Sequence, residues 1–168
     1  SQRGLSLTVN HIKENDVWNV ITEVTNNGKQ PVTLELLSSF LLKDVKVDRV
    51  HRMQSFWSAE GKLKSESITD LHMEKSWNGC ACRVEKFGNV GSMPVRKYFP
   101  FLVVEDCEKG EFTGVQLYLA SSWQIEMRCR EKETYTISGG IADRDFGQWT
   151  KKLNAGETFT APKAVVAK

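Results

Sequence analysis

The sequence predicts an all-β domain, built as an antiparallel sandwich or barrel. Short runs in which apolar and polar residues alternate recur along the chain and are separated by turn-forming residues. No window keeps apolar residues at the i, i+3, i+4, i+7 spacing of an amphipathic helix over three turns. Regularly spaced strands without helices are typical of these two architectures. The 168 residues fit one domain, spanning 1–168, with a single core.

The clearest predicted strand covers residues 17–25, where Trp18, Val20 and Thr22 share one face. We expect it to end in a tight hairpin at Asn27-Gly28, because this pair readily adopts positive φ angles. One helical turn is possible within 142–152, and 87–97 is the longest loop-like segment. The other predicted strands are 5–12, 31–40, 45–53, 99–105, 112–120, 123–130, 134–138 and 157–167.

Composition and charge argue against several classes of protein. The chain has 23 Lys and Arg against 21 Asp and Glu, a formal charge of +2 that is spread along the sequence. A nucleic-acid partner is therefore not expected, since it would usually require a basic patch. No apolar run approaches the ~20 residues of a membrane helix, so no membrane partner is expected either.

The four cysteines do not have the spacing of a zinc site. Cys80, Cys82, Cys107 and Cys129 include no Cys-x-x-Cys pair and have no histidine partner. We expect four free thiols and a cytoplasmic protein, with a disulfide and an exported protein as the alternative.

No catalytic constellation is recognisable. Glycoside hydrolysis needs two carboxyl groups that face each other across the scissile bond. The only tight acidic pair, Asp143 and Asp145, is expected to form a turn satisfied by the intervening Arg144. The three histidines, His11, His51 and His72, lie far apart on different predicted strands. We therefore expect no catalytic residue, no metal site and no cofactor.

The five tryptophans are better candidates for function. Trp18 and Trp123 lie in regular alternation and are predicted to be core residues. Trp57 lies instead in a break between strands, beside Ser58 and Gly61. An exposed indole offers a flat apolar surface on which the C–H face of a sugar can stack. A core position and a functional loop both remain open for Trp57.

Several segments in a fixed order resemble a known family. They are 56–61 (Phe-Trp-Ser-Ala-Glu-Gly), 83–88 (Arg-Val-Glu-Lys-Phe-Gly), 91–96 (Gly-Ser-Met-Pro-Val-Arg), 99–101, 122–126, 138–147 and 156–162. Together they resemble the N-terminal domain of family 36 glycoside hydrolases, the α-galactosidases or melibiases. The resemblance extends over nearly the whole chain.

This resemblance implies a twisted antiparallel super-sandwich, similar to galactose mutarotase, that precedes a (β/α)8 catalytic barrel. The barrel of that family carries both catalytic aspartates, one in a Lys-Trp-Asp motif that this sequence lacks. A barrel alone needs upwards of about 200 residues. The resemblance also implies that the chain starts inside the family's domain, so we expect a bare sheet edge and self-association.

Partners and site residues follow from the same resemblance. The expected partners are the protein's own barrel, the neighbouring subunits of an oligomer and, through the full enzyme, an α-galactoside. The loop that bears Trp57 resembles the one that reaches a neighbour's active-site mouth. Trp57, and more loosely Asp48, are thus implied to contact the galactose unit in trans.

Three functions are therefore in competition. The first is a non-catalytic module of an α-galactosidase. The second is a stand-alone carbohydrate-binding module, which would bind sugar by itself. The third is a small mutarotase-like enzyme, which would need a histidine and a carboxylate converging in one cleft.

Overall fold

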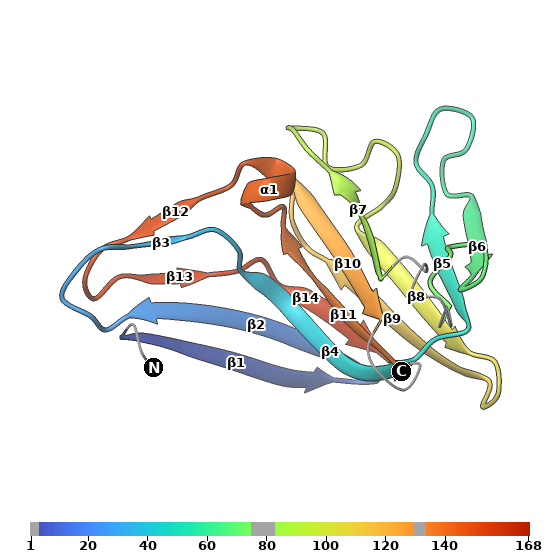
Figure 1. Cartoon of the computed structure of the whole chain (residues 1–168), viewed down its shortest axis with the longest axis horizontal. Helices are drawn as coiled ribbons and strands as arrows, with labels where there is room; N and C mark the ends of the chain where they lie inside the picture. Colours follow the sequence, from blue (N-terminus) through green and yellow to red (C-terminus); the bar gives the residue numbers. More distant parts are fainter. Residues whose placement is uncertain (1–3, 75–82, 130–133) are drawn as a thin grey trace.

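The computed structural model is a two-layer β-sandwich with a two-stranded ribbon at one end (Figure 1). It describes residues 4–74, 83–129 and 134–168. No helix in these ranges is long and apolar enough to cross a membrane. The elements are β1 (Leu5–Glu14), β2 (Val17–Asn26), β3 (Val32–Leu34), β4 (Ser38–Lys46), β5 (Arg49–Met53), β6 (Leu63–Ser67), β7 (Val84–Asn89), β8 (Phe101–Asp106), β9 (Glu111–Leu117), β10 (Trp123–Cys129), β11 (Thr134–Ile141), α1 (Arg144–Gly147), β12 (Lys151–Leu153), β13 (Thr158–Thr160) and β14 (Ala164–Ala167).

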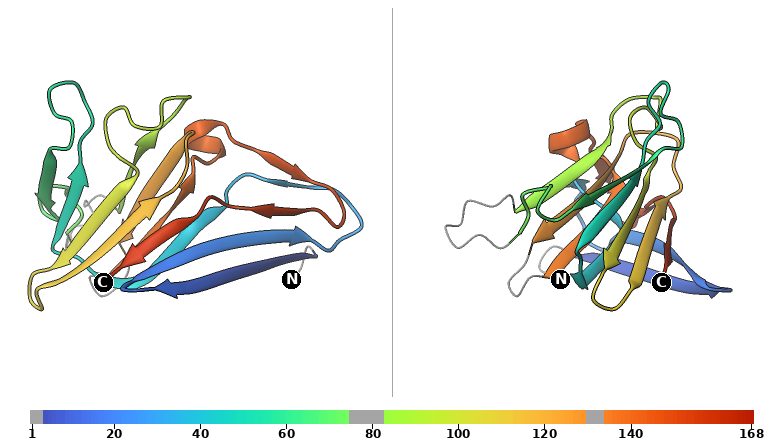
Figure 2. Two further views of the ribbon diagram at one scale, coloured as in Figure 1. Left: turned by 180° about the vertical axis from the view of Figure 1, so that it is seen from behind. Right: turned by 90° about the vertical axis from the view of Figure 1, so that its right-hand side faces the viewer.

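The larger layer has the strand order β1-β2-β14-β9-β8-β5-β6, with β13 also paired to β2. The smaller layer has the order β4-β11-β10-β7. All pairings are antiparallel, as predicted for a sandwich. The back and side views in Figure 2 show that the small sheet faces only part of the large one, and that β1 and β2 extend beyond it.

The core lies between the two sheets and includes Trp123. This residue of β10 is completely buried, as predicted, and its ring meets that of Phe87 edge-on, with 5.7 Å between centroids. Phe87 in turn makes an edge contact with Tyr98 at 5.6 Å. The Trp123 Nε1 donates a hydrogen bond of 2.5 Å to the carbonyl oxygen of Pro94. We call these three rings, Phe87, Tyr98 and Trp123, the aromatic junction.

Several predicted strands are divided in the structure. The 31–40 prediction falls on β3 and the start of β4, the 45–53 prediction on the end of β4 and on β5, and the 157–167 prediction on β13 and β14. The chain changes sheet at the first two of these breaks, whereas β13 and β14 both pair with β2 in the larger sheet. Alternation within one segment does not encode such breaks. β6, β7 and β12 were not predicted, and β7 extends to Asn89, into the predicted loop.

The predicted hairpin at Asn27-Gly28 is wrong. After Asn26 the chain leaves β2, and β3 pairs with β12, more than 100 residues later in the sequence. The buried Asn26 amide directs this departure, because its Nδ2 donates to the carbonyl oxygens of Gln30 and Leu153 and its Oδ1 accepts from Gly28 N. The tight hairpin instead joins β1 and β2 at Asn15-Asp16, with Asn15 at φ 54°.

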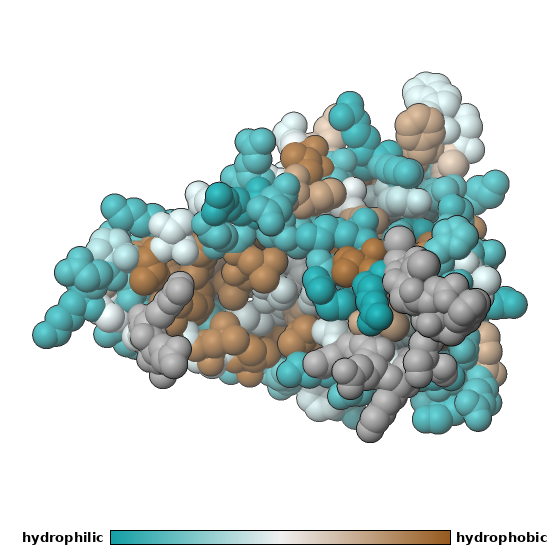
Figure 3. All heavy atoms as spheres, in the orientation of Figure 1, coloured by the Kyte–Doolittle hydropathy of each residue, from teal (hydrophilic) through white to brown (hydrophobic). Residues whose placement is uncertain are grey.

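Trp18 is not a core residue, contrary to the prediction. It is 41% exposed and lines an apolar groove of about 860 Å³ between β4 and the inner face of β1 and β2. The alternation correctly assigns Trp18 to the inner face, but no described strand of the small sheet covers that part of β2. Figure 3 shows apolar side chains gathered over the same region. Leu7, Leu36 and Leu41 are also exposed along this groove.

The contact between β7 and β10 leads to the first testable prediction. A Cβ atom on Gly88 would lie 2.1 Å from the Trp123 carbonyl oxygen and 2.9 Å from the Gln124 Cα. Gly88→Ala should therefore push β7 away from β10 and lower the free energy of unfolding by about 2 kcal/mol or more. Urea denaturation of the chain measures this change.

Gly114→Ala is the matched control for that substitution. Gly114 is also a strand glycine, in β9, but its added Cβ would meet only the Val103 Cγ2, at an ordinary 3.6 Å. Its stability should stay close to that of the original chain. Equal stabilities of the two variants would contradict the packing described for β7.

Candidate functional site

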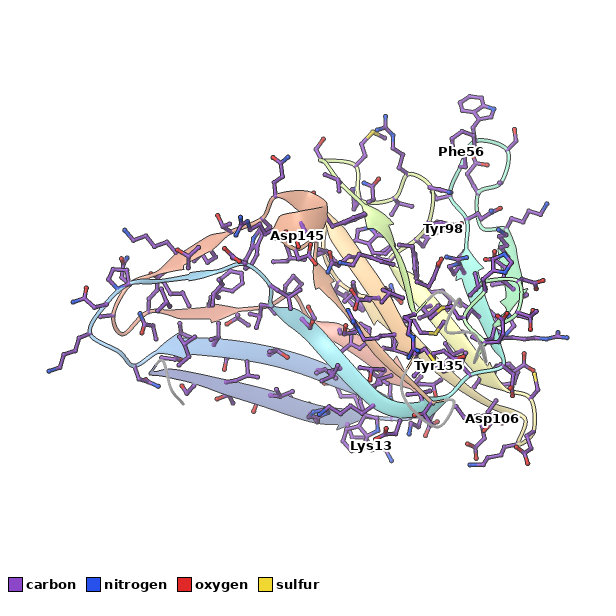
Figure 4. The ribbon with its side chains drawn as sticks, viewed as in Figure 1. Lys13, Phe56, Tyr98, Asp106, Tyr135 and Asp145 are labelled. Atoms are coloured by element: carbon purple, nitrogen blue, oxygen red, sulfur yellow. The ribbon has the colours of Figure 1, made fainter. Side chains whose placement is uncertain are left out.

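Trp57 lies at the tip of the hairpin that joins β5 to β6. We call residues 54–62 the Trp57 loop. Trp57 is 84% exposed and its neighbour Phe56 is 63% exposed, which excludes the core position that the sequence left open for Trp57. In Figure 4 the loop projects from the end of β5, and the labelled Phe56 lies at this tip.

The Trp57 loop is short and internally hydrogen-bonded. The backbone N–H of Gln54 donates to the Lys62 carbonyl at 2.8 Å, and that of Gly61 donates back to Gln54 at 2.9 Å. The N–H of Ala59 donates to the Phe56 carbonyl at 2.8 Å. Ser58 and Gly61 have φ angles of 62° and 75°, a left-handed conformation that glycine adopts without strain. The indole is thus presented on a defined turn.

A second connection, between β7 and β8, supports the base of the Trp57 loop. The N–H of Ser55 donates to the Lys97 carbonyl at 2.9 Å, and Gln54 forms a β-bridge with Tyr98. Met93, in the same connection, is 60% exposed. Figures 1 and 2 both place the β5–β6 and β7–β8 connections along one edge of the molecule. This edge therefore presents apolar side chains from two separate loops.

Arg52 links the Trp57 loop to the core. Its side chain is only 4% exposed and forms ion pairs with Glu66 of β6 and Glu85 of β7, the latter at 2.6 Å. Its guanidinium carbon lies 5.1 Å from the ring centroids of both Phe87 and Tyr98. These contacts join β5, β6, β7 and the aromatic junction. Since Arg52 lies two residues before the Trp57 loop, the clamp lies at the base of that loop.

The charges of this clamp shift the pKa of Glu66. Burial alone would raise the pKa, but hydrogen bonds from Lys64 and Arg52 and their positive charges outweigh it. The net result is a pKa below the usual value of a glutamate. The carboxylate of Glu66 is therefore held in its ionised form.

Asp48 lies at the other end of β5, before its first residue. Its Oδ2 accepts a 2.8 Å hydrogen bond from the backbone N–H of Cys107, and its own N–H donates to the Glu105 carbonyl. It thus supports the turn between β8 and β9, next to Asp106, which Figure 4 shows at the edge opposite Phe56. The structure does not bring Asp48 and Trp57 together within one chain, and sugar binding by Asp48 remains a prediction.

Two of the other sequence candidates, Asp143 and Arg144, have structural partners. Asp143 caps α1, where its side chain accepts a hydrogen bond from the Phe146 N–H. Arg144 pairs with Glu35 rather than with its two acidic neighbours, so the predicted self-satisfied turn is wrong. The sequence did not reveal this pairing because Glu35 and Arg144 lie in distant segments.

The three histidines lie in separate places: His11 in β1, His51 in β5 and His72 in the turn after β6. His51 does meet a carboxylate, with 3.1 Å between its Nε2 and the Glu105 Oε2. Its Nδ1 lies 2.8 Å from the Ser65 Oγ. Protein atoms thus engage both ring nitrogens, and neither is left for a substrate. Within the described ranges, no group of three or more His, Cys, Asp or Glu is arranged to hold a metal ion.

Some predictions concern residues outside the described ranges. These include the tryptophan Trp77 and two cysteines, Cys80 and Cys82. Cys107 is exposed and forms no disulfide. The count of four free thiols therefore remains a prediction for chemical titration.

The lowered pKa of Glu66 predicts how stability depends on pH. A carboxylate whose pKa falls on folding stabilises the folded chain above its unfolded pKa, and this contribution is lost as the pH falls through the folded value. Glu66→Gln should lower the free energy of unfolding by about 1 kcal/mol at pH 7. The difference from the original chain should shrink below about pH 4. Urea denaturation at pH 7 and pH 3 measures both values.

Glu60→Gln is the control, because Glu60 lies exposed in the Trp57 loop. It should change the stability little at either pH. A Glu66→Gln difference that is the same at both pH values would contradict the ionic clamp around Arg52.

Comparison with known proteins shows a shared fold. No family model matches the chain, and no curated protein matches its sequence. Among solved structures, it is similar to the family 36 α-galactosidase AgaA of Geobacillus stearothermophilus, with 17% identity and a TM-score of 0.81. It is equally similar to the α-galactosidase of Lactobacillus brevis, with 17% identity and a TM-score of 0.81. The chain is also similar to the galactosidase domain of an α-galactosidase-sucrose kinase, AgaSK, with 17% identity and a TM-score of 0.79.

These matches cover 98–99% of this chain but only 21–22% of each longer protein. The chain therefore has the fold of about one fifth of an α-galactosidase.

Proposed function

We propose that this chain is a non-catalytic module of an α-galactosidase, which supports the catalytic barrel and contributes the Trp57 loop to an active-site mouth. The observation that carries the proposal is a nearly fully exposed tryptophan on a braced hairpin, in a fold shared with part of known α-galactosidases. The likeness to these enzymes makes a hydrolase parent plausible.

The chemistry of the Trp57 loop fits a sugar contact. An indole offers a flat apolar face to the C–H groups of a galactose ring, and its N–H can donate to a hydroxyl group. The loop is held by its own backbone hydrogen bonds, by the β7–β8 connection and by the Arg52 clamp. Little conformational entropy would therefore be lost on binding. Such preorganisation is what a wall of a binding site requires.

The Trp57 loop projects from its own domain, which favours a contact with a neighbouring subunit or another domain. Trp57 is 84% exposed, so its own domain covers little of the indole surface. A neighbouring subunit, or the barrel of the same chain, would supply the rest of a galactose site. We propose the neighbouring subunit. A change at Trp57 would then affect activity only in the assembled oligomer.

Trp57→Ala should cost little stability but reduce activity. Because the indole is exposed, its loss should change the free energy of unfolding by less than about 1 kcal/mol, against about 3–5 kcal/mol for a buried tryptophan. In the full-length α-galactosidase, loss of the stacking face should raise KM. Loss of contacts that tighten in the transition state should also lower kcat. The measurements are thermal unfolding of this chain and hydrolysis kinetics of the full enzyme.

Trp123→Ala provides the contrast, because Trp123 is fully buried in the aromatic junction. It should lower the melting temperature of the chain strongly. If Trp57→Ala instead gave a large fall in melting temperature with unchanged kinetics, the role of the loop in substrate binding would be refuted.

The chain alone should not hydrolyse an α-galactoside. Four carboxylates are engaged in structural contacts: Asp143 caps α1, Glu66 and Glu85 clamp Arg52, and Asp48 supports a turn. A chromogenic α-galactoside assay with purified chain should give no turnover above background. Activity that persists through repurification would sink the module proposal.

A further inference from the structure

A polar hollow lies on the outer face of the four-stranded sheet, away from the Trp57 loop. Its volume is about 400 Å³, and its walls come from β7, β10, β11, α1 and the segment before β4. We call it the α1 hollow and define it by Lys86, Glu126, Arg128, Ser138 and Asp143. The volume falls within the range of about 300–1,000 Å³ that is common for small-molecule sites.

Asp143 lies at the centre of a hydrogen-bond network in the wall of the α1 hollow. Asp143 Oδ2 accepts 2.9 Å hydrogen bonds from Lys86 Nζ and from Gln124 Nε2, and the Asp143 N–H donates to Gln124 Oε1 at 2.9 Å. The backbone N–H of Phe146 donates to the other carboxylate oxygen, at 2.7 Å. The Asp143 carboxylate thus accepts three hydrogen bonds, and it positions Lys86.

Other groups in the hollow keep hydrogen-bonding capacity. Lys86 has three N–H donors and two carboxylate partners, Asp143 and, at 3.3 Å, Glu126. Glu126 accepts from Arg128 on one oxygen and meets Lys86 with the other, which leaves further lone pairs open. Arg128 and the hydroxyl group of Ser138 add donors at the rim.

The balance of charge selects the class of ligand. Three cationic and four carboxylate side chains line the hollow. Ion pairs join Lys86 to Asp143 and Glu126, Arg128 to Glu126, and Arg144 to Glu35. An anion would meet carboxylates on several sides, and a cation would meet Lys86 at the centre. A neutral ligand with several hydroxyl groups avoids both penalties, because each hydroxyl both donates and accepts. Leu36, at the edge, adds one apolar contact for a C–H face.

We propose that the α1 hollow binds one hexose unit of a neutral saccharide. Vicinal hydroxyl groups would contact Glu126 and Arg128, and the ammonium group of Lys86 would donate to a third oxygen. This site is independent of the Trp57 loop and does not rest on the proposed α-galactosidase role. With few apolar contacts, its affinity should be weak, with a Kd of about 1–10 mM.

The experiment is a titration of the isotope-labelled chain with methyl α-galactopyranoside, followed by amide chemical shifts. Saturable shifts are expected on β7, β10 and α1. Two variants test the assignment, Glu126→Gln and Arg128→Gln. Each should weaken binding at least about 10-fold, which corresponds to 1.4 kcal/mol. Arg128 is 60% exposed, so its replacement should leave the fold intact even if Glu126→Gln is destabilising.

A control makes the outcome decisive. Glu111→Gln, at an exposed position in β9, should leave the affinity unchanged. The proposal is overturned if no saturable shift appears, if the shifts lie only around the Trp57 loop, or if both hollow variants bind as well as the original chain. Because binding is measured on this chain without the barrel, failure here would leave the kinetic test of Trp57 in the full enzyme untouched.

Discussion

The edge-on contact of Phe87 and Trp123 is the interaction on which the rest of the sandwich depends. β7 and β10 are neighbours in the small sheet, and the side chains that fill the core from them must fit between two twisted layers. At Gly88, next to Phe87, the Trp123 backbone lies too close for any side chain to fit. The close approach of the two strands sets the geometry of the Phe87–Trp123 ring contact. Tyr98, which packs on Phe87, extends this cluster of rings toward β5.

Arg52 converts this packing into a support for the exposed loop. A buried guanidinium group is costly unless its charge is paired, and here two carboxylates and two aromatic faces surround it. Among the described residues, its Nε has no hydrogen-bond partner. If this position served only to stabilise the core, an apolar side chain would do so without the free-energy cost of burying a charge. What the charged clamp adds is a fixed relation among β5, β6 and β7 at the base of the Trp57 loop.

Local pattern was sufficient for some of these features and insufficient for others. Alternation identified β10 and the burial of Trp123, and the break in alternation left a core position and an exposed loop open for Trp57, of which the structure shows the loop. The same alternation misplaced Trp18, because exposure there depends on how far the small sheet extends over β2. The pairing of β3 with β12 and the ion pair between Glu35 and Arg144 join segments more than 100 residues apart. No local signal marks such pairs. The role of Arg52 was likewise not predictable, because it depends on contacts with Glu85 and Tyr98 from other segments.

The two candidate sugar contacts differ in the physics that would make them work. The Trp57 loop offers one large apolar face with almost no surrounding wall, so it can bind tightly only when a second body completes the site. The α1 hollow offers walls and many polar groups but little apolar area, so it can act alone but only weakly. A strong contact that needs a partner suits an active-site mouth. A weak contact that does not need one suits holding a saccharide near the enzyme, and a single protein can use both.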